Sequence, residues 1–69
     1  MTKKIKVDGM MCSHCEARVK KALEAVEGVV SAAADHNTGY ATVELDRDVD
    51  NEVLRKAVEA QGYDVLGIE

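Results

Sequence analysis

Apolar and polar side chains alternate along the chain with two different periods. Ile5 and Val7 alternate with charged neighbours, and this spacing predicts a strand over residues 3–8. From Cys15 to Val26 the apolar side chains recur every three or four residues, which predicts a helix with one apolar face. By the same criteria the chain continues with strands over 29–35 and 40–46, a helix over 51–61 and a strand over 63–68.

Residues typical of helix caps and turns stand at the ends of these predicted elements. Ser13 is the expected N-cap of the first helix, because Glu16 stands three residues later, at the spacing of a capping box. Gly28 is expected to end that helix as its C′ residue. Asp50 is the expected N-cap of the second helix. Residues 36–39 are typical of a turn, and this turn joins two of the strands into a hairpin.

The predicted order of elements is β-α-β-β-α-β. Two β-α-β units of this size joined by a hairpin indicate an α+β, ferredoxin-like open-faced sandwich, with a four-stranded antiparallel sheet and both helices on one face. A chain of 69 residues is expected to form one domain over 1–69. The chain has no Phe and no Trp, so its core leaves little room for an enclosed substrate cavity of about 300 Å³. The composition therefore argues against a self-contained enzyme.

Charge and hydropathy narrow the classes of partner. The net charge is −4 and no long run of one sign occurs, which argues against nucleic acid binding. No apolar run approaches the ~20 residues of a membrane-spanning helix, and no apolar signal-peptide segment follows the charged start. We therefore expect a cytoplasmic protein without membrane insertion, in a compartment that keeps thiols reduced.

The segment that carries chemistry is Gly-Met-Met-Cys-Ser-His-Cys at residues 9–15, between the first predicted strand and the first predicted helix. Its two cysteines, Cys12 and Cys15, are close enough in sequence to bind one ion with both sulfurs. The N-terminus of a helix supplies unpaired N–H groups and a partial positive charge. Both favour the thiolate, which is the species that binds metal. Cys12 and Cys15 are thus the predicted metal ligands.

The number of available ligands narrows the choice of metal. Thiolates select Cu(I), zinc and the iron of iron–sulfur clusters. Structural zinc needs four protein ligands and an iron–sulfur cluster normally needs four Cys, whereas this chain has two Cys and two His. One of those histidines, His36, is interpreted as a residue of the predicted turn, distant from the motif. Cu(I) therefore fits the donor set best, while Hg(II), Ag(I) and Cd(II) stay open.

Three further residues are candidates for supporting the site. Met10 is expected to pack into the core and anchor the loop, rather than to bind copper through its thioether. His14 is expected to point away from the sulfurs, in a supporting or solvent-exposed role. Tyr63 begins the last predicted strand, beside the metal loop, and either shields the site or is a tyrosine at the core edge. Two alternative functions remain for the same cysteines: a redox-active dithiol, and a carrier or sequestering domain for another soft metal, namely zinc, cadmium, mercury or silver.

With the motif of residues 9–15 on this order of elements, the chain resembles the heavy-metal-associated domain family over essentially its whole length. The likeness is greatest to bacterial cytosolic copper chaperones, which often carry a His where His14 stands and a Tyr where Tyr63 stands. Met11, rather than an acidic residue, precedes Cys12, and this favours copper over zinc or cadmium. The resemblance implies transfer of Cu(I) to the soft-metal domain of a copper-exporting P-type ATPase, and a copper-responsive repressor as a further partner. A two-coordinate ion also leaves open a metal-bridged dimer of a protein that is monomeric without metal.

Overall fold

The computed structural model describes residues 1–69 and contains each predicted element, with every predicted boundary within two residues of the observed one. Neither helix has the length and apolar character that crossing a membrane requires. The elements are β1 (Thr2–Asp8), α1 (Ser13–Glu24), β2 (Val29–Asp35), β3 (Tyr40–Leu45), α2 (Asn51–Glu59) and β4 (Asp64–Ile68).

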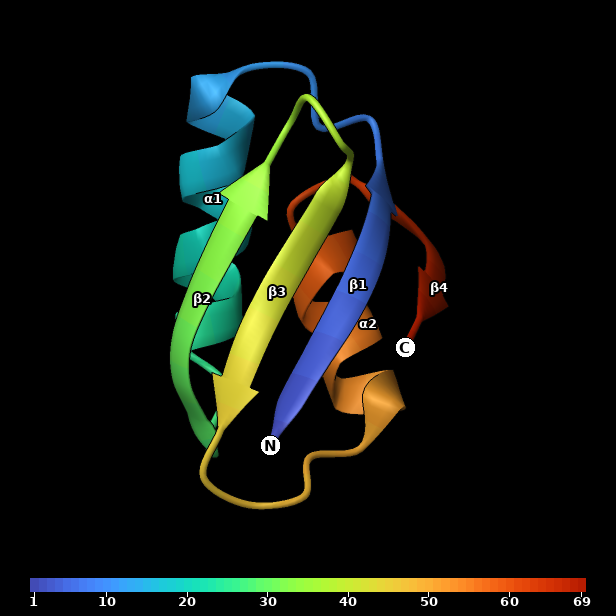
Figure 1. The fold of residues 1–69 in the computed structure, drawn as a ribbon. Coiled ribbons are helices and arrows are strands. Elements are labelled where there is room, and N and C mark those ends of the chain that lie inside the picture. The colour runs from blue at the N-terminus through green and yellow to red at the C-terminus, as the bar shows by residue number, and fades with distance from the viewer.

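The four strands form one sheet in the order β2-β3-β1-β4, and all three neighbouring pairs are antiparallel. Both helices cover the same face of this sheet, and the other face is open (Figure 1). The predicted ferredoxin-like α+β sandwich is therefore confirmed. In this topology the loop between β1 and α1 and the turn between β2 and β3 lie at the same end of the molecule (Figure 1).

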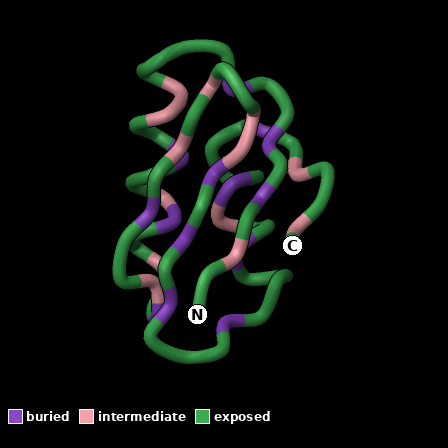
Figure 2. Tube along the Cα trace, viewed as in Figure 1, coloured by how far each residue is buried: buried purple, intermediate pink, exposed green.

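The core lies between the sheet and the two helices, and Figure 2 shows the buried positions alternating along β1 and β3. The alternation predicted for β1 is confirmed, because Ile5 and Val7 are buried while their neighbours face solvent. No polar or charged side chain is buried. The cluster of 13 buried residues consists of Ile5, Val7, Met10, Val19, Leu23, Ala32, Ala41, Val43, Leu45, Val49, Leu54, Val58 and Tyr63.

Two irregularities interrupt the strand pairing. The register shifts between Lys6 and Val7 in the pairing of β1 with β4, and between Val29 and Ser31 in the pairing of β2 with β3. The second shift leaves Val30 as an extra residue without a partner, and its side chain is exposed. An extra residue in one strand is how a β-bulge bends that strand, and simple alternation does not predict it.

The ends of the helices agree only partly with the sequence signals. The Asp50 N-cap is confirmed, since its side chain accepts a hydrogen bond from the backbone N–H of Glu52 at 3.4 Å. The prediction for Gly28 is wrong, because α1 ends at Glu24 and its C-cap is Ala25. Gly28 instead turns the chain into β2 with φ +98°, close under the side chain of Val49.

Candidate metal centre

The two cysteines lie where the loop after β1 enters α1. Cys12 is the N-cap residue of the helix, with extended backbone angles of φ −154° and ψ 174°, and Cys15 lies in the first helical turn. Their Sγ atoms are 3.5 Å apart. Both thiols are free, with Cys12 exposed and Cys15 half-buried against the core. The structure therefore brings both predicted ligands together at one accessible point.

The loop is shaped by the residues that precede the cysteines. Gly9 turns the chain away from β1 with φ +95°, a region that only glycine enters without strain. Met10 is buried in the core, with 4% of its surface exposed, whereas Met11 is 81% exposed. Met10 therefore anchors the loop from the inside and leaves Met11 and Cys12 at the outer surface.

The start of α1 lacks the predicted side-chain cap. Ser13 was the expected N-cap, but that position belongs to Cys12, and no side chain caps the helix there. The helix begins with the backbone hydrogen bond from the N–H of Glu16 to the carbonyl oxygen of Cys12, at 3.1 Å. The capping-box prediction is wrong because the Glu16 side chain does not reach back to the cap. It contacts a different element.

The pKa of the Cys15 thiol is lowered from 9.0 to about 7. The largest cause is a hydrogen bond with the Tyr63 hydroxyl, followed by one from the backbone at Met11 and one from the Cys12 side chain. Partial burial opposes these effects, since it disfavours the charged thiolate. Hydrogen bonding to the charged form thus makes a large share of Cys15 ionised near neutral pH.

Tyr63 reaches this site from the chain segment just before β4. Its side chain is buried, and its ring lies beneath Gly9, since a Cβ on Gly9 would stand 3.5 Å from Cδ1 of the tyrosine. The pKa of the Tyr63 hydroxyl is raised, mainly by its hydrogen bond with Cys15, and Arg18 opposes that rise. Tyr63 is therefore buried at the core edge, and its hydroxyl bonds to the sulfur of Cys15. A role in shielding the site stays a prediction.

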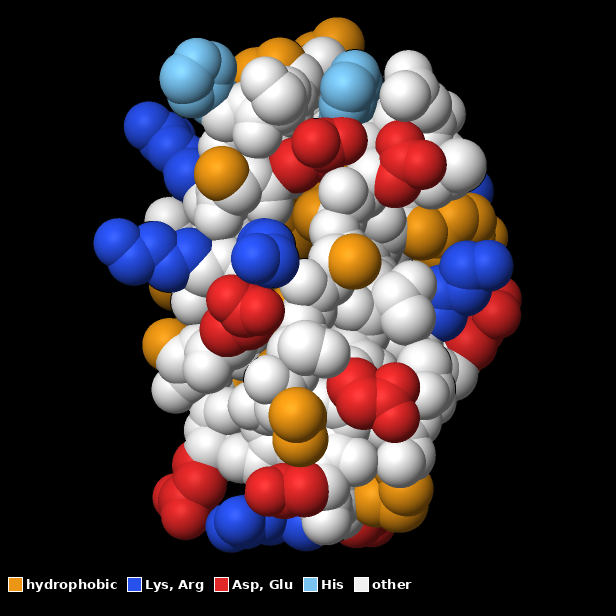
Figure 3. Space-filling model, turned by 60° about the vertical axis from the view of Figure 1, so that its left-hand side comes forward, with side chains coloured by type: hydrophobic (Ala, Val, Ile, Leu, Met, Phe, Trp, Pro, Cys, Tyr) orange, Lys and Arg blue, Asp and Glu red, His pale blue; other side chains and the backbone are white.

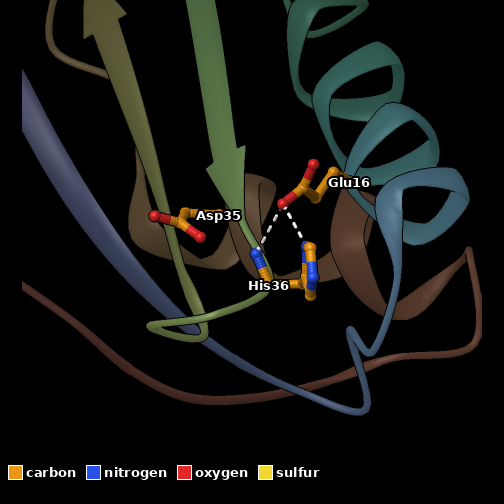
Figure 4. A group of neighbouring side chains, drawn as sticks. All are labelled: Glu16, Asp35 and His36. Atoms are coloured by element: carbon orange, nitrogen blue, oxygen red, sulfur yellow. Dashed lines mark hydrogen bonds and ion pairs between the residues drawn. The ribbon is translucent and has the colours of Figure 1, made fainter.

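The two histidines lie at the end of the molecule that carries the cysteine loop (Figure 3). His14 is exposed, and its side chain takes part in no hydrogen bond or ion pair. His36 belongs to the turn between β2 and β3, but the expectation that this turn is distant from the motif is wrong. Both its backbone N–H and its ring Nδ1 lie within hydrogen-bonding distance of Glu16 Oε2, at 2.7 Å and 2.6 Å (Figure 4).

The contact between Glu16 and His36 is the feature that sequence reasoning missed. The His36 hydrogen bonds lower the pKa of the Glu16 carboxyl below its ordinary value of 4.5. The spacing of Ser13 and Glu16 favoured a local cap, so only the topology could have signalled the contact. In this fold, the turn after β2 lies beside the start of α1 (Figure 1).

Fold and site together define a class of small α+β domains that hold two adjacent free thiols at the corner between a strand and a helix. Residues 4–64 match the model of the heavy-metal-associated domain, and the chain belongs to this family. This agrees with the resemblance seen in the sequence.

Relatives and solved structures within this family resemble the chain over nearly its full length. The copper chaperone CopZ of Staphylococcus epidermidis is 45% identical over 67 residues, which cover 94% of this chain and 98% of that protein. The structure of a CopZ metallochaperone aligns with a TM-score of 0.90 at 36% identity, over 96% of this chain and 100% of the other. A copper-binding domain from HMA7, a P-type ATPase, aligns with a TM-score of 0.86 at 32% identity, over 100% and 99%.

Proposed function

We propose that this chain is a cytoplasmic copper chaperone, which binds one Cu(I) through Cys12 and Cys15 and passes it to another protein. The observation that carries the proposal is the pair of free sulfur atoms, 3.5 Å apart, at an accessible helix N-terminus. The likeness to relatives described as copper chaperones supports copper as the cargo. In this proposal residues 1–69 act as a single metal-binding domain, and the protein transfers the metal ion rather than catalysing a reaction.

The oxidation state follows from the chemistry of the donors. Two thiolates are soft ligands and prefer Cu(I) to harder ions. Two thiolates with one Cu(I) carry a net charge of −1, which the partial positive charge at the start of α1 stabilises. The 3.5 Å between the two sulfur atoms places both within reach of a single ion.

Transfer is proposed to proceed by ligand exchange. Because Cys12 and Met11 are exposed, an ion held by only two sulfurs would leave room for a thiolate of the partner, which would add as a third ligand. One sulfur of this chain then dissociates as a thiolate, so each metal–sulfur bond that forms replaces one that breaks and copper stays Cu(I). The exposure of Cys12 and Met11 supports this approach from outside.

The partner that this mechanism suits best has the same kind of site. A partner domain with the same fold and two thiolates offers the ion equivalent ligands, so transfer needs little net driving force. The similar copper-binding domain of a P-type ATPase supports such a domain as the recipient. We further propose a copper-responsive repressor as a second partner and a metal-bridged dimer of this chain. The proposed function involves neither nucleic acid nor membrane insertion.

A competition titration tests the proposal. Reduced protein is titrated with Cu(I) against a chromophoric Cu(I) chelator, and stoichiometry is checked by mass spectrometry under non-denaturing conditions. We expect one Cu(I) per chain, and a loss of affinity by orders of magnitude in Cys12→Ser and in Cys15→Ser. Ser13→Ala is the matched control, because Ser13 lies between the cysteines and is exposed. Unchanged affinity in both cysteine variants would defeat the proposal, and disulfide reductase turnover would favour the redox dithiol instead.

A further inference from the structure

The helical turn that carries Cys15 begins without a side-chain cap. Ser, Thr, Asp or Asn at an N-cap stabilises the start of a helix by roughly 0.5–2 kcal/mol relative to Ala. Here the N-cap is Cys12, which makes no such bond, and α2 offers the contrast of a capped start at Asp50. Because the proposed metal ligand occupies the capping position, the first turn of α1 needs support from another element.

Glu16 and His36 supply such support. Glu16 directly follows Cys15, and its Oε2 atom is 2.7 Å from the backbone nitrogen and 2.6 Å from Nδ1 of His36 (Figure 4). An ionised carboxylate only accepts hydrogen bonds, so the backbone N–H and Nδ1–H of His36 both donate. The two side chains are only 26% and 34% exposed, and shielding from water strengthens such charge-assisted bonds.

The turn that carries His36 is itself fixed. The backbone N–H of Asn37 donates to Oδ1 of Asp35 at 2.9 Å, and the N–H of Gly39 donates to the carbonyl oxygen of Asp35 at 2.9 Å. The N–H of Val7 donates to the carbonyl oxygen of Gly39 at 2.8 Å, which joins the turn to the end of β1. A continuous path of bonds therefore runs from β1 through the turn to the helical residue beside Cys15.

Glu16, Asp35 and His36 also form a group in which one carboxylate oxygen of each acid and one ring nitrogen of His36 lie within 4.8 Å of one another. Both carboxylates already accept hydrogen bonds within or next to this group. Each bond also joins backbone to side chain or one element to another. The arrangement therefore acts as a connection between the turn and the helix.

We propose that His36 is a positioning residue of the metal centre: by holding Glu16, it fixes the uncapped first turn of α1 and with it the sulfur of Cys15. This inference rests on the proposed function, since it assumes that Cys15 is a metal ligand. The imidazole does not bind the metal. It restricts the motion of the helical turn on which one ligand is carried.

Three variants of the turn test this inference. His36→Ala removes the Nδ1 donor and keeps the backbone N–H. His36→Asn keeps a donor, because its side-chain nitrogen is separated from Cα by the same number of bonds as Nδ1, but it carries no charge. Asn37→Ala is the matched control, since the Asn37 side chain makes no hydrogen bond. Each variant is compared with the wild type for amide exchange, Cu(I) affinity by chelator competition, and urea unfolding of the metal-free protein.

For His36→Ala we expect about tenfold faster amide exchange at residue 16, whose N–H closes the first turn of α1, and Cu(I) affinity lower by about three- to tenfold, since one net hydrogen bond corresponds to factors of this size. His36→Asn should restore both values, and Asn37→Ala should match the wild type. Wild-type affinity and exchange in His36→Ala would overturn the inference. So would a uniform rise in exchange over the whole chain, which would indicate a general structural role, or failure of His36→Asn to restore affinity, which would indicate an effect of charge. If wild-type protein itself fails to bind Cu(I), the proposed function fails instead.

Discussion

The hydroxyl of Tyr63 and the sulfur of Cys15 share a hydrogen bond between the segment that enters β4 and the first turn of α1. The bond shifts the two acidities in opposite directions, because it stabilises the thiolate and the neutral phenol together. The pKa of Cys15 falls to about 7, and that of Tyr63 rises above its ordinary value of 10.0. A residue near the C-terminus of the chain thereby controls how readily one thiol near the N-terminus ionises.

Removal of the Tyr63 hydroxyl should raise the pKa of Cys15. The change is Tyr63→Phe in a Cys12→Ser background, so that only one thiol reacts, and the pKa is read from the pH dependence of alkylation by iodoacetamide. Tyr40→Phe in the same background is the control, because the Tyr40 ring lies on the open face of the sheet beneath Lys4, whose Nζ is 4.5 Å from the ring centre. An alkylation profile identical for Tyr63→Phe and Tyr40→Phe would contradict the assignment.

The lowered pKa of Cys15 also predicts how stability depends on pH. A thiol with a pKa of about 7 in the folded protein and an ordinary value of 9.0 binds fewer protons when folded, so the free energy of unfolding rises with pH through this interval. The contribution is complete above about pH 9 and is lost as the pH falls below about 7. The raised pKa of Tyr63 acts in the opposite direction, but only near and above pH 10.

Urea unfolding of the reduced, metal-free protein at several values between pH 6.5 and 9 checks this dependence. The wild type should gain stability relative to Cys15→Ser as the pH rises, and the two should converge toward the acidic end. Parallel curves for the two proteins across the whole interval would show that Cys15 ionisation does not differ between folded and unfolded states.

The elements of the fold could be predicted because their signals are local. Alternation at Ile5 and Val7 places β1, and the same rule places β3, since one face of each strand packs on the helices. The bulge at Val30 could not be predicted, because an extra residue in one strand depends on the pairing with β3. The end of α1 was misjudged at Gly28, where glycine is needed for a close approach to Val49 rather than for a helix cap.

In the metal site, too, the features that depend on local sequence could be predicted and those that depend on tertiary contacts could not. Cys12 and Cys15 lie three residues apart at the start of a helix, so their proximity follows from local geometry. The contact between Glu16 and His36 depends on where the sheet places the turn after β2, and the local capping signal pointed elsewhere. Local patterns thus predict which residues are the metal ligands. The residues that position those ligands can be identified only from the tertiary structure.

The effect of a Leu→Ala substitution on stability should depend on whether the leucine is buried or exposed. Leu54 is 0% exposed and Leu66 is 61% exposed. Leu54→Ala should lower the free energy of unfolding by about 3 kcal/mol, because it removes buried methyl groups and leaves a cavity. Leu66→Ala should change it by less than about 0.5 kcal/mol. Urea unfolding of both variants measures the two losses, and a loss at Leu66 as large as that at Leu54 would mean that β4 is packed differently.

Two glycines, one after each helix, allow the cost of backbone conformation to be separated from the cost of close packing. Gly28 and Gly62 have nearly equal angles, φ +98° and φ +93°. A Cβ at Gly28 would stand 2.7 Å from Cγ2 of the buried Val49, whereas a Cβ at Gly62 would meet nothing within 4 Å. Gly62→Ala should therefore cost about 1–2 kcal/mol for the left-handed backbone alone. Gly28→Ala should cost a further 1–3 kcal/mol or so, because Val49 has to move in a close-packed core. Equal losses in urea unfolding would show that backbone conformation is the whole reason for glycine at both positions, and that the approach of Gly28 to Val49 relaxes freely.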